Sequence, residues 1–184
     1  MKSKLASPAE TFTSVGTTSL VQTELESPVG TLQLIASDAG IRALLWPMDG
    51  TRVRTGLTEL VDAADHPVLR ETKQQLEYYF EGTLTKFDLP LDPVGTEFQL
   101  DAWRALSNIG YGKTASYAEQ ALKIGRPKAV RAVGAANGKN PISIIVPCHR
   151  VIGSNGSLTG FAAGVDAKRW LLDHERRVAG ESLF

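Results

Sequence analysis

The hydrophobic and polar positions in the first half of the chain fall into short β-type segments, followed by one helical segment. The β-type segments cover residues 19–26, 31–36 and 41–46, and the turn sequences Ser27-Pro28-Val29-Gly30 and Asp38-Ala39-Gly40 separate them. Segments of this length between glycine and proline turns are typical of strands that follow one another in a sheet. The pattern therefore predicts an antiparallel meander.

From His66 to Phe80 the spacing of apolar residues changes to that of a helix. The positions that recur at this spacing are Val68, Leu69, Leu76, Tyr79 and Phe80. Gly82 is expected to end the helix, because glycine commonly follows the last helical residue. Residues 87–92 contain two prolines, which favours an edge strand or a linker into the second half.

The second half of the chain has a mainly helical pattern. A helix is expected from Thr96 to just before Gly110; its apolar stripe consists of Phe98, Ala102, Trp103 and Leu106. Ser116-Tyr117-Ala118-Glu119 fits a capping box, in which the serine and glutamate side chains satisfy backbone amides at a helix start. A short helix should follow, to about Ile124.

A second short helix is expected to start at Pro127 and to close at Gly138, following the usual preference for proline at the start and glycine at the end. Two short helices joined by a tight glycine turn predict a helix-turn-helix. Val130 and Val133 should face inward. The opposite face carries Arg131, Gly134, Ala135 and Gly138.

This bare helix face has two interpretations. Small side chains let a polymer backbone approach closely, and Arg131 is long enough to reach out from that contact. The same small residues are equally suited to packing against another helix. Spacing alone leaves both interpretations open.

The apolar run Ile142 to Val146 predicts a short buried strand, and the last helix is expected from about Asp166. The whole pattern indicates an α+β protein with a mixed N-terminal domain, built on an antiparallel sheet, and a mainly helical C-terminal domain. We place the domains at residues 19–93 and 94–184. Residues 1–18 are polar with little periodicity and are expected to form a mobile N-terminal arm.

Composition excludes several classes of protein. The chain has 42% hydrophobic and 22% charged residues, as ordinary globular proteins do. It contains no apolar run of membrane-spanning length and no signal-peptide core, so we expect a cytoplasmic protein. Cys148 is the only cysteine and the three histidines are scattered, so we expect neither a disulfide nor a bound metal.

The formal net charge is zero, but the charges are unevenly distributed. Residues 1–93 carry a net charge of −5 and residues 94–184 a net charge of +5. The segment from residue 113 to residue 150 contains seven basic residues and a single acidic residue, Glu119. A local basic surface of this kind is what phosphate binding requires, although a solvated basic face is an equally good interpretation of charge alone.

Cys148 stands out as a candidate nucleophile. A lone cysteine is more often a small buried apolar residue, but this one follows Pro147 at the end of the apolar run. His149, Arg150 and nearby Lys139 surround it in sequence, and positive neighbours favour the reactive thiolate.

His149 could act as the base if another group fixed its ring. On the last helix the stripe Leu171, Glu175, Val178 places one carboxylate among apolar side chains, and a buried charge needs a partner. Cys148, His149 and Glu175 thus compose a nucleophile, a base and an orienting acid. A structural ion pair between Glu175 and Arg150 is the alternative interpretation.

Several sequence motifs together resemble the O6-alkylguanine-DNA alkyltransferases. The most specific is Asn140-Pro141 followed by Ile-Ile-Val-Pro-Cys148-His-Arg-Val-Ile-Gly. The others, in the same order as in the family, are Ser27-Pro28-Val29-Gly30-Thr31-Leu32, Gly95-Thr96-Glu97-Phe98-Gln99, Ser116-Tyr117, Arg131-Ala132-Val133-Gly134 and Trp170-Leu171-Leu172-Asp173-His174-Glu175. The resemblance spans nearly all of the chain beyond residue 18.

The resemblance implies a ribonuclease H-like N-terminal domain and direct-reversal DNA repair: one alkyl group, such as the methyl of O6-methylguanine, passes to Cys148 in a single turnover. The base must first be flipped out of the duplex. The partner would be double-stranded DNA carrying alkylated guanine, bound without a cofactor. A monomer is expected; activity on O4-alkylthymine and cooperative binding along DNA are left open.

The resemblance also assigns roles to individual residues. Arg131 would fill the vacated base stack, and Tyr117 would crowd the flipped nucleotide's phosphate and donate to the guanine ring. Asn140 would tie the recognition helix to the active-site turn. Further DNA contacts would come from Arg126, Gly134 and Ser154, and the base pocket would include Val151, Phe161, Ala162 and Ala163.

One loop departs from the family pattern. Phe161 stands where the family commonly has tyrosine, and Ala163 where it commonly has glycine. The extra methyl and the lower backbone freedom predict a tighter pocket that prefers methyl to bulky adducts. Two other classes of protein are alternatives: a lesion-binding protein without chemistry, which Cys148 argues against, and a cysteine hydrolase, for which no oxyanion-hole motif is evident.

Overall fold

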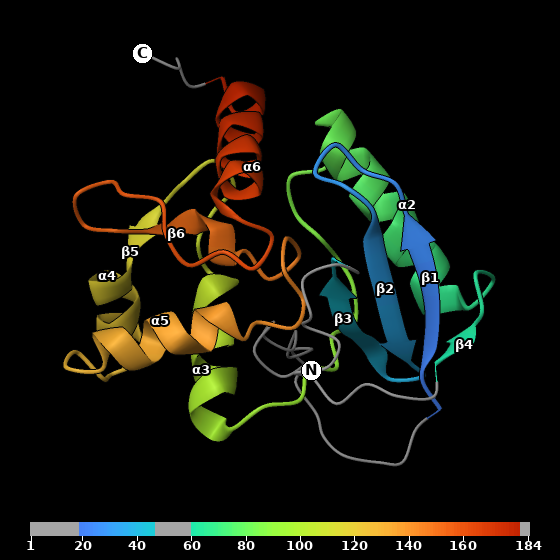
Figure 1. Cartoon of the computed structure of the whole chain (residues 1–184), viewed down its shortest axis with the longest axis horizontal. Helices are drawn as coiled ribbons and strands as arrows, with labels where there is room; N and C mark the ends of the chain where they lie inside the picture. The colour runs from blue at the N-terminus through green and yellow to red at the C-terminus, as the bar shows by residue number, and fades with distance from the viewer. Residues whose placement is uncertain (1–18, 47–59, 181–184) are drawn as a thin grey trace, which may run out of the picture.

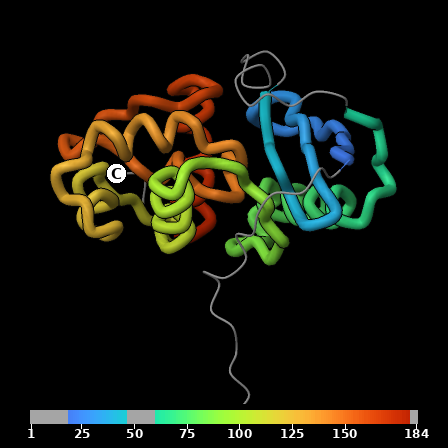
Figure 2. Tube along the Cα trace, turned by 90° about the horizontal axis from the view of Figure 1, so that it is seen from below, coloured from blue at the N-terminus to red at the C-terminus, as the bar shows by residue number. Residues whose placement is uncertain are grey.

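The structure, a computed structural model, describes residues 19–46 and 60–180. Figure 2 shows two lobes joined by the segment at residues 82–96. Among the described residues, a sheet with one helix forms the N-terminal lobe, and four helices dominate the C-terminal lobe (Figure 1). The predicted arm at residues 1–18 lies outside the described residues. In the described part, no helix is both long and apolar enough to cross a bilayer.

The N-terminal sheet consists of β1 (Val21–Leu25), β2 (Leu32–Ser37), β3 (Gly40–Leu45) and the short β4 (Val61–Asp62). The strand order is β3-β2-β1-β4. The pairs β1/β2 and β2/β3 are antiparallel, which confirms the predicted meander. β4 joins β1 in parallel, so the sheet is mixed, a feature that the sequence pattern did not indicate.

The helix α2 (Pro67–Glu81) lies along one face of this sheet, as Figure 1 shows. Its fully buried Leu69, Leu76 and Tyr79 belong to the same apolar core as Leu32 and Leu34. Gly82 ends the helix in the left-handed region at φ 79°, where a side chain would be strained. The predicted helix therefore differs from the observed one by one residue at each end, and the predicted stop at Gly82 is correct.

The outer edge of β3 is covered by two segments from later in the chain. Leu91 forms a single parallel bridge to Ile41, and Ile142 forms another to Leu44. Residues 87–92, expected as an edge strand or a linker, form this one bridge at Leu91 and otherwise connect the two lobes. The Pro90 carbonyl still accepts from the Ile41 amide at 2.8 Å.

The C-terminal lobe contains α3 (Glu97–Leu106), β5 (Ala115–Ser116), α4 (Tyr117–Lys123), α5 (Val130–Gly138), the 3-10 turn η2 (Cys148–Arg150), β6 (Val151–Ile152) and α6 (Val165–Val178). The capping box at Ser116 and Glu119 is present, with both side chains bonded to the backbone. β5 and β6 pair in parallel, which places the start of α4 beside the residues that follow Cys148.

The predicted start of the second short helix at Pro127 is wrong. The helix α5 begins at Val130, and the Ala129 amide closes a tight turn on the Arg126 carbonyl at 2.8 Å. Proline favours the second position of such a turn as strongly as it favours a helix start. The turn therefore uses Pro127 and delays the helix by three residues.

Candidate functional site

The predicted strand at residues 142–146 is also wrong, although its burial is correct. Pro141 to Arg150 are all buried, but residues 143–145 form a turn and only Ile142 pairs with a strand. Ile144 adopts φ 73°, a region that is costly for a β-branched side chain. A strained, buried turn thus leads into Cys148.

Asn140 holds this turn together. Its side-chain amide donates to the Val146 carbonyl at 2.8 Å, and its side-chain oxygen accepts from the Ile142 amide at 3.0 Å. Asn140 lies two residues beyond the end of α5. It therefore links the end of that helix to the backbone that leads to Cys148.

Cys148 begins the η2 turn and is buried. Its Sγ lies 3.8 Å from the Ser143 hydroxyl. Burial raises the pKa of the Cys148 thiol, while hydrogen bonds from Asn140 and Ser143 and the charge of Lys168 lower it in part. The expectation of a thiolate favoured by Arg150 and Lys139 is wrong, because burial outweighs the charges.

The neighbouring His149 is fully buried and bonds to Glu175 on α6. Its Nε2 lies 2.8 Å from Glu175 Oε1. Burial lowers the pKa of His149, although Glu175 opposes that shift, so the ring is neutral near pH 7. A carboxylate only accepts, so Nε2 carries the proton and Nδ1 has a free lone pair. Within the described residues, His149 Nδ1 has no hydrogen-bond partner.

Glu175 is the centre of this buried network. Burial raises its pKa, but hydrogen bonds and charges from His149 and Arg150 outweigh burial and hold the pKa well below its usual range. Arg150 donates through Nε and Nη2, both at 2.9 Å. The Tyr79 hydroxyl and the Gly112 amide complete the set at 2.8 and 3.1 Å. Glu175 therefore contacts both partners considered from the sequence, the histidine and the arginine.

Tyr117 starts α4 and lies close to the cysteine. Its hydroxyl donates to the Thr159 carbonyl at 3.2 Å. Burial raises the pKa of Tyr117, so the phenol keeps its proton at neutral pH. A side chain added at Gly134 would meet the Tyr117 ring at 3.8 Å, which places α5 against this ring.

Lys168 was not among the expected residues. It lies on α6 almost wholly buried, and its Nζ donates to the carbonyls of Val151 and Thr159 at 2.6 and 2.9 Å. It also lies 5.9 Å from the centre of the Tyr117 ring. Its position, seven residues before Glu175 on the same helix face, was the sequence signal that could have identified it.

The loop before α6 contributes the other residues expected at the base pocket. Phe161 is buried and packs edge-on against Trp46 at 5.7 Å between ring centres. Ala162 is exposed and Ala163 is half-buried. The positive φ angles of this loop fall on Gly160 and Gly164, so Ala163 replaces the usual glycine without backbone strain.

The residues expected to contact DNA lie on the surface of the C-terminal lobe. Arg126, Arg131 and Ser154 are exposed, and Gly134 is half-buried. On α5, Val133 faces the core while Ala135 and Gly138 are exposed beside Arg131, so the small-residue face is open rather than packed on a helix. Of the seven basic side chains between residues 113 and 150, Arg150 is turned inward to Glu175.

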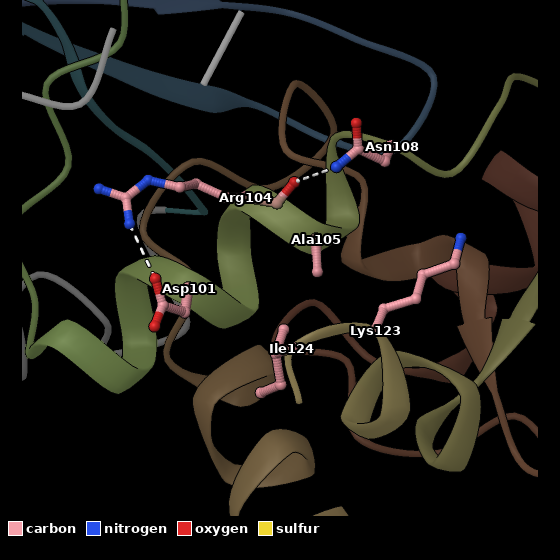
Figure 3. A pocket seen from close by; sticks show the side chains of 6 residues that line it. All are labelled: Asp101, Arg104, Ala105, Asn108, Lys123 and Ile124. Atoms are coloured by element: carbon pink, nitrogen blue, oxygen red, sulfur yellow. Dashed lines mark hydrogen bonds and ion pairs between the residues drawn. The ribbon is translucent and has the colours of Figure 1, made fainter. Parts of the chain in front are cut away.

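A separate hollow lies between α3 and α4, away from Cys148. Figure 3 shows its lining, which consists of Asp101, Arg104, Ala105, Asn108, Lys123 and Ile124. Arg104 donates to Asp101 at 2.9 Å, and Asn108 donates to the Arg104 carbonyl at 3.2 Å. None of these residues was expected at the site.

The two lobes match two domains of one protein family. Residues 97–177 match the DNA-binding domain of 6-O-methylguanine DNA methyltransferase. Residues 20–93 match the ribonuclease-like domain of the same family. The matches therefore extend over both the sheet and the helical lobe.

Individual relatives agree with this assignment. A methylated-DNA–protein-cysteine methyltransferase of Methanosarcina barkeri is 46% identical over 82% of this chain and 94% of its own length. One from Mycolicibacterium paratuberculosis is 50% identical over 86% of this chain and 94% of its own. The crystal structure of Mycobacterium tuberculosis OGT in complex with DNA is 44% identical with a TM-score of 0.77, covering 86% of this chain and 94% of that one. The chain belongs to the 6-O-methylguanine DNA methyltransferase family.

Proposed function

We propose that this protein repairs DNA by direct reversal, moving the alkyl group of O6-methylguanine onto Cys148 in one turnover. The observation that carries the proposal is the buried group formed by Cys148, His149 and Glu175. Cys148 is followed in the chain by a histidine whose Nε2 lies 2.8 Å from the carboxylate and whose Nδ1 is unpartnered in the described part of the chain. That arrangement suits removal of the thiol proton.

The first event is activation of the thiol. Because burial keeps Cys148 protonated, the base must take its proton as the alkyl group arrives. We assign this step to His149 Nδ1, directly or through one water, while Glu175 stabilises the imidazolium that forms. The thiolate then attacks the alkyl carbon, so that an S–C bond forms as the C–O6 bond breaks.

The guanine must leave with its developing charge neutralised. We assign to the Tyr117 hydroxyl a proton or hydrogen bond donated to the departing ring, since its phenol is protonated. Over the whole reaction, the thiol proton replaces the alkyl group on guanine, and the protein ends as a thioether. Thiol-reducing systems do not reverse a thioether, so each molecule acts once.

Access to a base inside a duplex requires flipping. We assign to Arg131, exposed on the open face of α5, the filling of the vacated stack, with Arg126, Ser154 and Gly134 at the DNA backbone. The Cys148 and Val151 carbonyls would accept from the guanine amine. The Val151 carbonyl already accepts from Lys168 at 2.6 Å, and its second lone pair is the one for the base.

The test is intact-protein mass spectrometry after mixing the chain with a duplex oligonucleotide that carries O6-methylguanine. A gain of one methyl group per chain, mapped to Cys148 and saturating there, is the expected result. Continued turnover beyond one equivalent, or no gain at all, would exclude the proposed function. A monomeric state and a cytoplasmic location stay predictions.

Arg131→Ala is expected to slow transfer from duplex DNA by about tenfold, because the vacated stack is left unfilled and unstacking costs a few kcal/mol. Transfer from the free base O6-benzylguanine should be unchanged, since it needs no flipping. Single-turnover rates on both substrates check this. Arg70→Ala, which removes an exposed arginine on α2, is the matched control, and equal losses on both substrates would contradict the role of Arg131.

Phe161 and Ala163 are expected to make the pocket prefer small adducts. In oligonucleotides of the same sequence, O6-methylguanine should be repaired several-fold faster than O6-benzylguanine, because Phe161 is held against Trp46 and Ala163 adds a methyl group. Ala163→Gly should reduce the difference. Equal rates for both adducts in the unsubstituted chain would dispose of the idea.

A further inference from the structure

Among the described residues of the N-terminal lobe, the Tyr79 side chain hydrogen-bonds to the buried network around Glu175. Tyr79, near the end of α2, is fully buried, and its hydroxyl donates to Glu175 Oε1 at 2.8 Å. Its backbone carbonyl lies 2.7 Å from His174 Nε2. One residue of the N-terminal lobe thus bonds two consecutive residues of α6.

The ring of Tyr79 is fixed on several sides. Its centre lies 5.3 Å from those of Phe80 and Phe87, 5.4 Å from His174 and 6.0 Å from Tyr111. A ring packed in this way cannot rotate freely, so its hydroxyl stays directed at Glu175. Burial, the charge of Glu175 and the bond to it all raise the pKa of Tyr79, so the hydroxyl keeps its proton at neutral pH and donates a hydrogen bond to the carboxylate.

Glu175 Oε1 receives three donors, from Tyr79, His149 and Arg150. Each donor withdraws negative charge from the same oxygen, and in a buried site these effects are strong. The proton affinity of His149 therefore depends on how much charge Tyr79 withdraws. The hydroxyl also restrains the carboxylate from rotating away from the histidine.

We propose that Tyr79 is a positioning residue of the alkyl-transfer site, through which the N-terminal lobe sets the orientation of Glu175 and the charge that reaches His149. This inference rests on the proposed function, in which His149 takes the thiol proton. Tyr79 itself bonds to Glu175 and His174, and it is not assigned a contact with the thiol or with the guanine. Its action is exerted through Glu175.

Tyr79→Phe removes only the hydroxyl, and Tyr111→Phe is the matched control. The Tyr111 ring lies next to Tyr79, yet in the described part of the chain its buried hydroxyl has no hydrogen-bond partner. We expect Tyr79→Phe to slow single-turnover methyl transfer about tenfold, the lower range for losing a bond to a charged group. Binding to the same duplex should stay unchanged, and Tyr111→Phe should match the wild type.

The pH profile separates positioning from a merely structural role. Without the hydroxyl, Glu175 keeps more charge, the proton affinity of His149 rises, and the acid limb of the transfer rate moves to higher pH. Besides Tyr79, the ionisable groups packed around His149 and Glu175 are Cys148, Arg150, Tyr111, Lys168 and His174. Tyr79→Phe changes none of these groups, and Tyr111→Phe changes only Tyr111. Placing 3-fluorotyrosine, a stronger donor, at position 79 should move the limb to lower pH.

A measurement without DNA keeps this test independent of the proposed function. At one fixed pH, the ¹⁵N chemical shifts of the His149 ring should change in Tyr79→Phe and in the fluorotyrosine form but not in Tyr111→Phe. Unchanged shifts and an unchanged pH profile, or equal changes in Tyr111→Phe, would overturn the inference. Absence of methyl transfer in the wild type would instead refute the proposed function.

Discussion

Glu175→Gln is expected to slow alkyl transfer about a hundredfold, the scale of losing general-base assistance, and to lower the free energy of unfolding by about 3 kcal/mol. Glutamine has the same shape but one oxygen and no charge. Arg150 and His149 would then be buried opposite a neutral amide. The amide nitrogen is itself a donor, so it could not accept the hydrogen bonds that Arg150 and Gly112 donate to the carboxylate. Single-turnover kinetics and denaturant unfolding measure the two effects.

The structure changes what this variant is expected to do. From the sequence, Glu175 orients His149, so the variant should slow transfer and leave DNA binding nearly intact. Five hydrogen bonds converge on the carboxylate, so stability should fall as well, while DNA binding by the folded fraction stays nearly intact. Asp173→Asn, which removes a half-exposed acid on the same helix, is the control and should affect neither quantity.

The difference in unfolding free energy between the wild type and Glu175→Gln should depend on pH. The pKa of Glu175 lies well below its usual range in the folded protein and near 4.3 in the unfolded chain. The carboxylate therefore stabilises the fold fully above about pH 5, and this contribution is lost as the pH falls towards the folded pKa. The stability difference between wild type and Glu175→Gln should shrink between about pH 5 and pH 3. A constant difference would contradict the assignment.

Cys148→Ala is expected to abolish methyl transfer completely while keeping binding to the methylated duplex. The side chain is small and 7% exposed, so its truncation should cost about 1 kcal/mol of unfolding free energy. The hydrogen bonds of His149 and Arg150 do not involve the sulfur that is removed, and Asn140 keeps its bonds to Val146 and Ile142. Mass spectrometry and duplex-binding titration provide the two measurements.

The decisive comparison for Cys148→Ala is between a duplex with O6-methylguanine and the same duplex unmodified. Ser143→Ala, which removes the hydroxyl 3.8 Å from the sulfur, keeps the nucleophile and should still gain one methyl group. A methyl gain in Cys148→Ala, on any residue, would mean that the acceptor was assigned wrongly. Loss of all binding would mean that the thiol is needed for lesion recognition too.

The parts of the fold predicted correctly from the sequence are those with local causes. Ser116 and Glu119 specify a helix start by reaching each other's amides, and Gly82 ends α2 because only glycine adopts its φ without strain. His149 follows Cys148 directly, and Glu175 lies on a helix stripe that the apolar spacing reveals. Such signals lie within a few residues of the feature that they determine.

The wrong predictions arise where one local sequence pattern is compatible with two different structures. An apolar run such as Ile142 to Val146 meets the demand for burial equally well as a strand or as a buried turn. The turn prevails because Asn140 supplies the hydrogen bonds that a strand partner would otherwise provide. Tyr79 could not be identified at all, because its hydroxyl meets a residue 96 positions further along the chain.

The bridge between Leu44 and Ile142 also bears on the order in which the protein folds. The edge of β3 presents unpaired backbone groups of the kind that invite pairing with other chains. During synthesis the sheet residues emerge first, and Leu91 can cover the edge at Ile41. Ile142 follows only much later in the chain, so the edge at Leu44 is open until the second lobe docks. The segment that leads to the nucleophile therefore also covers the edge of the sheet in the first lobe. A C-terminal truncation before this segment would leave that edge exposed and the domain prone to self-association.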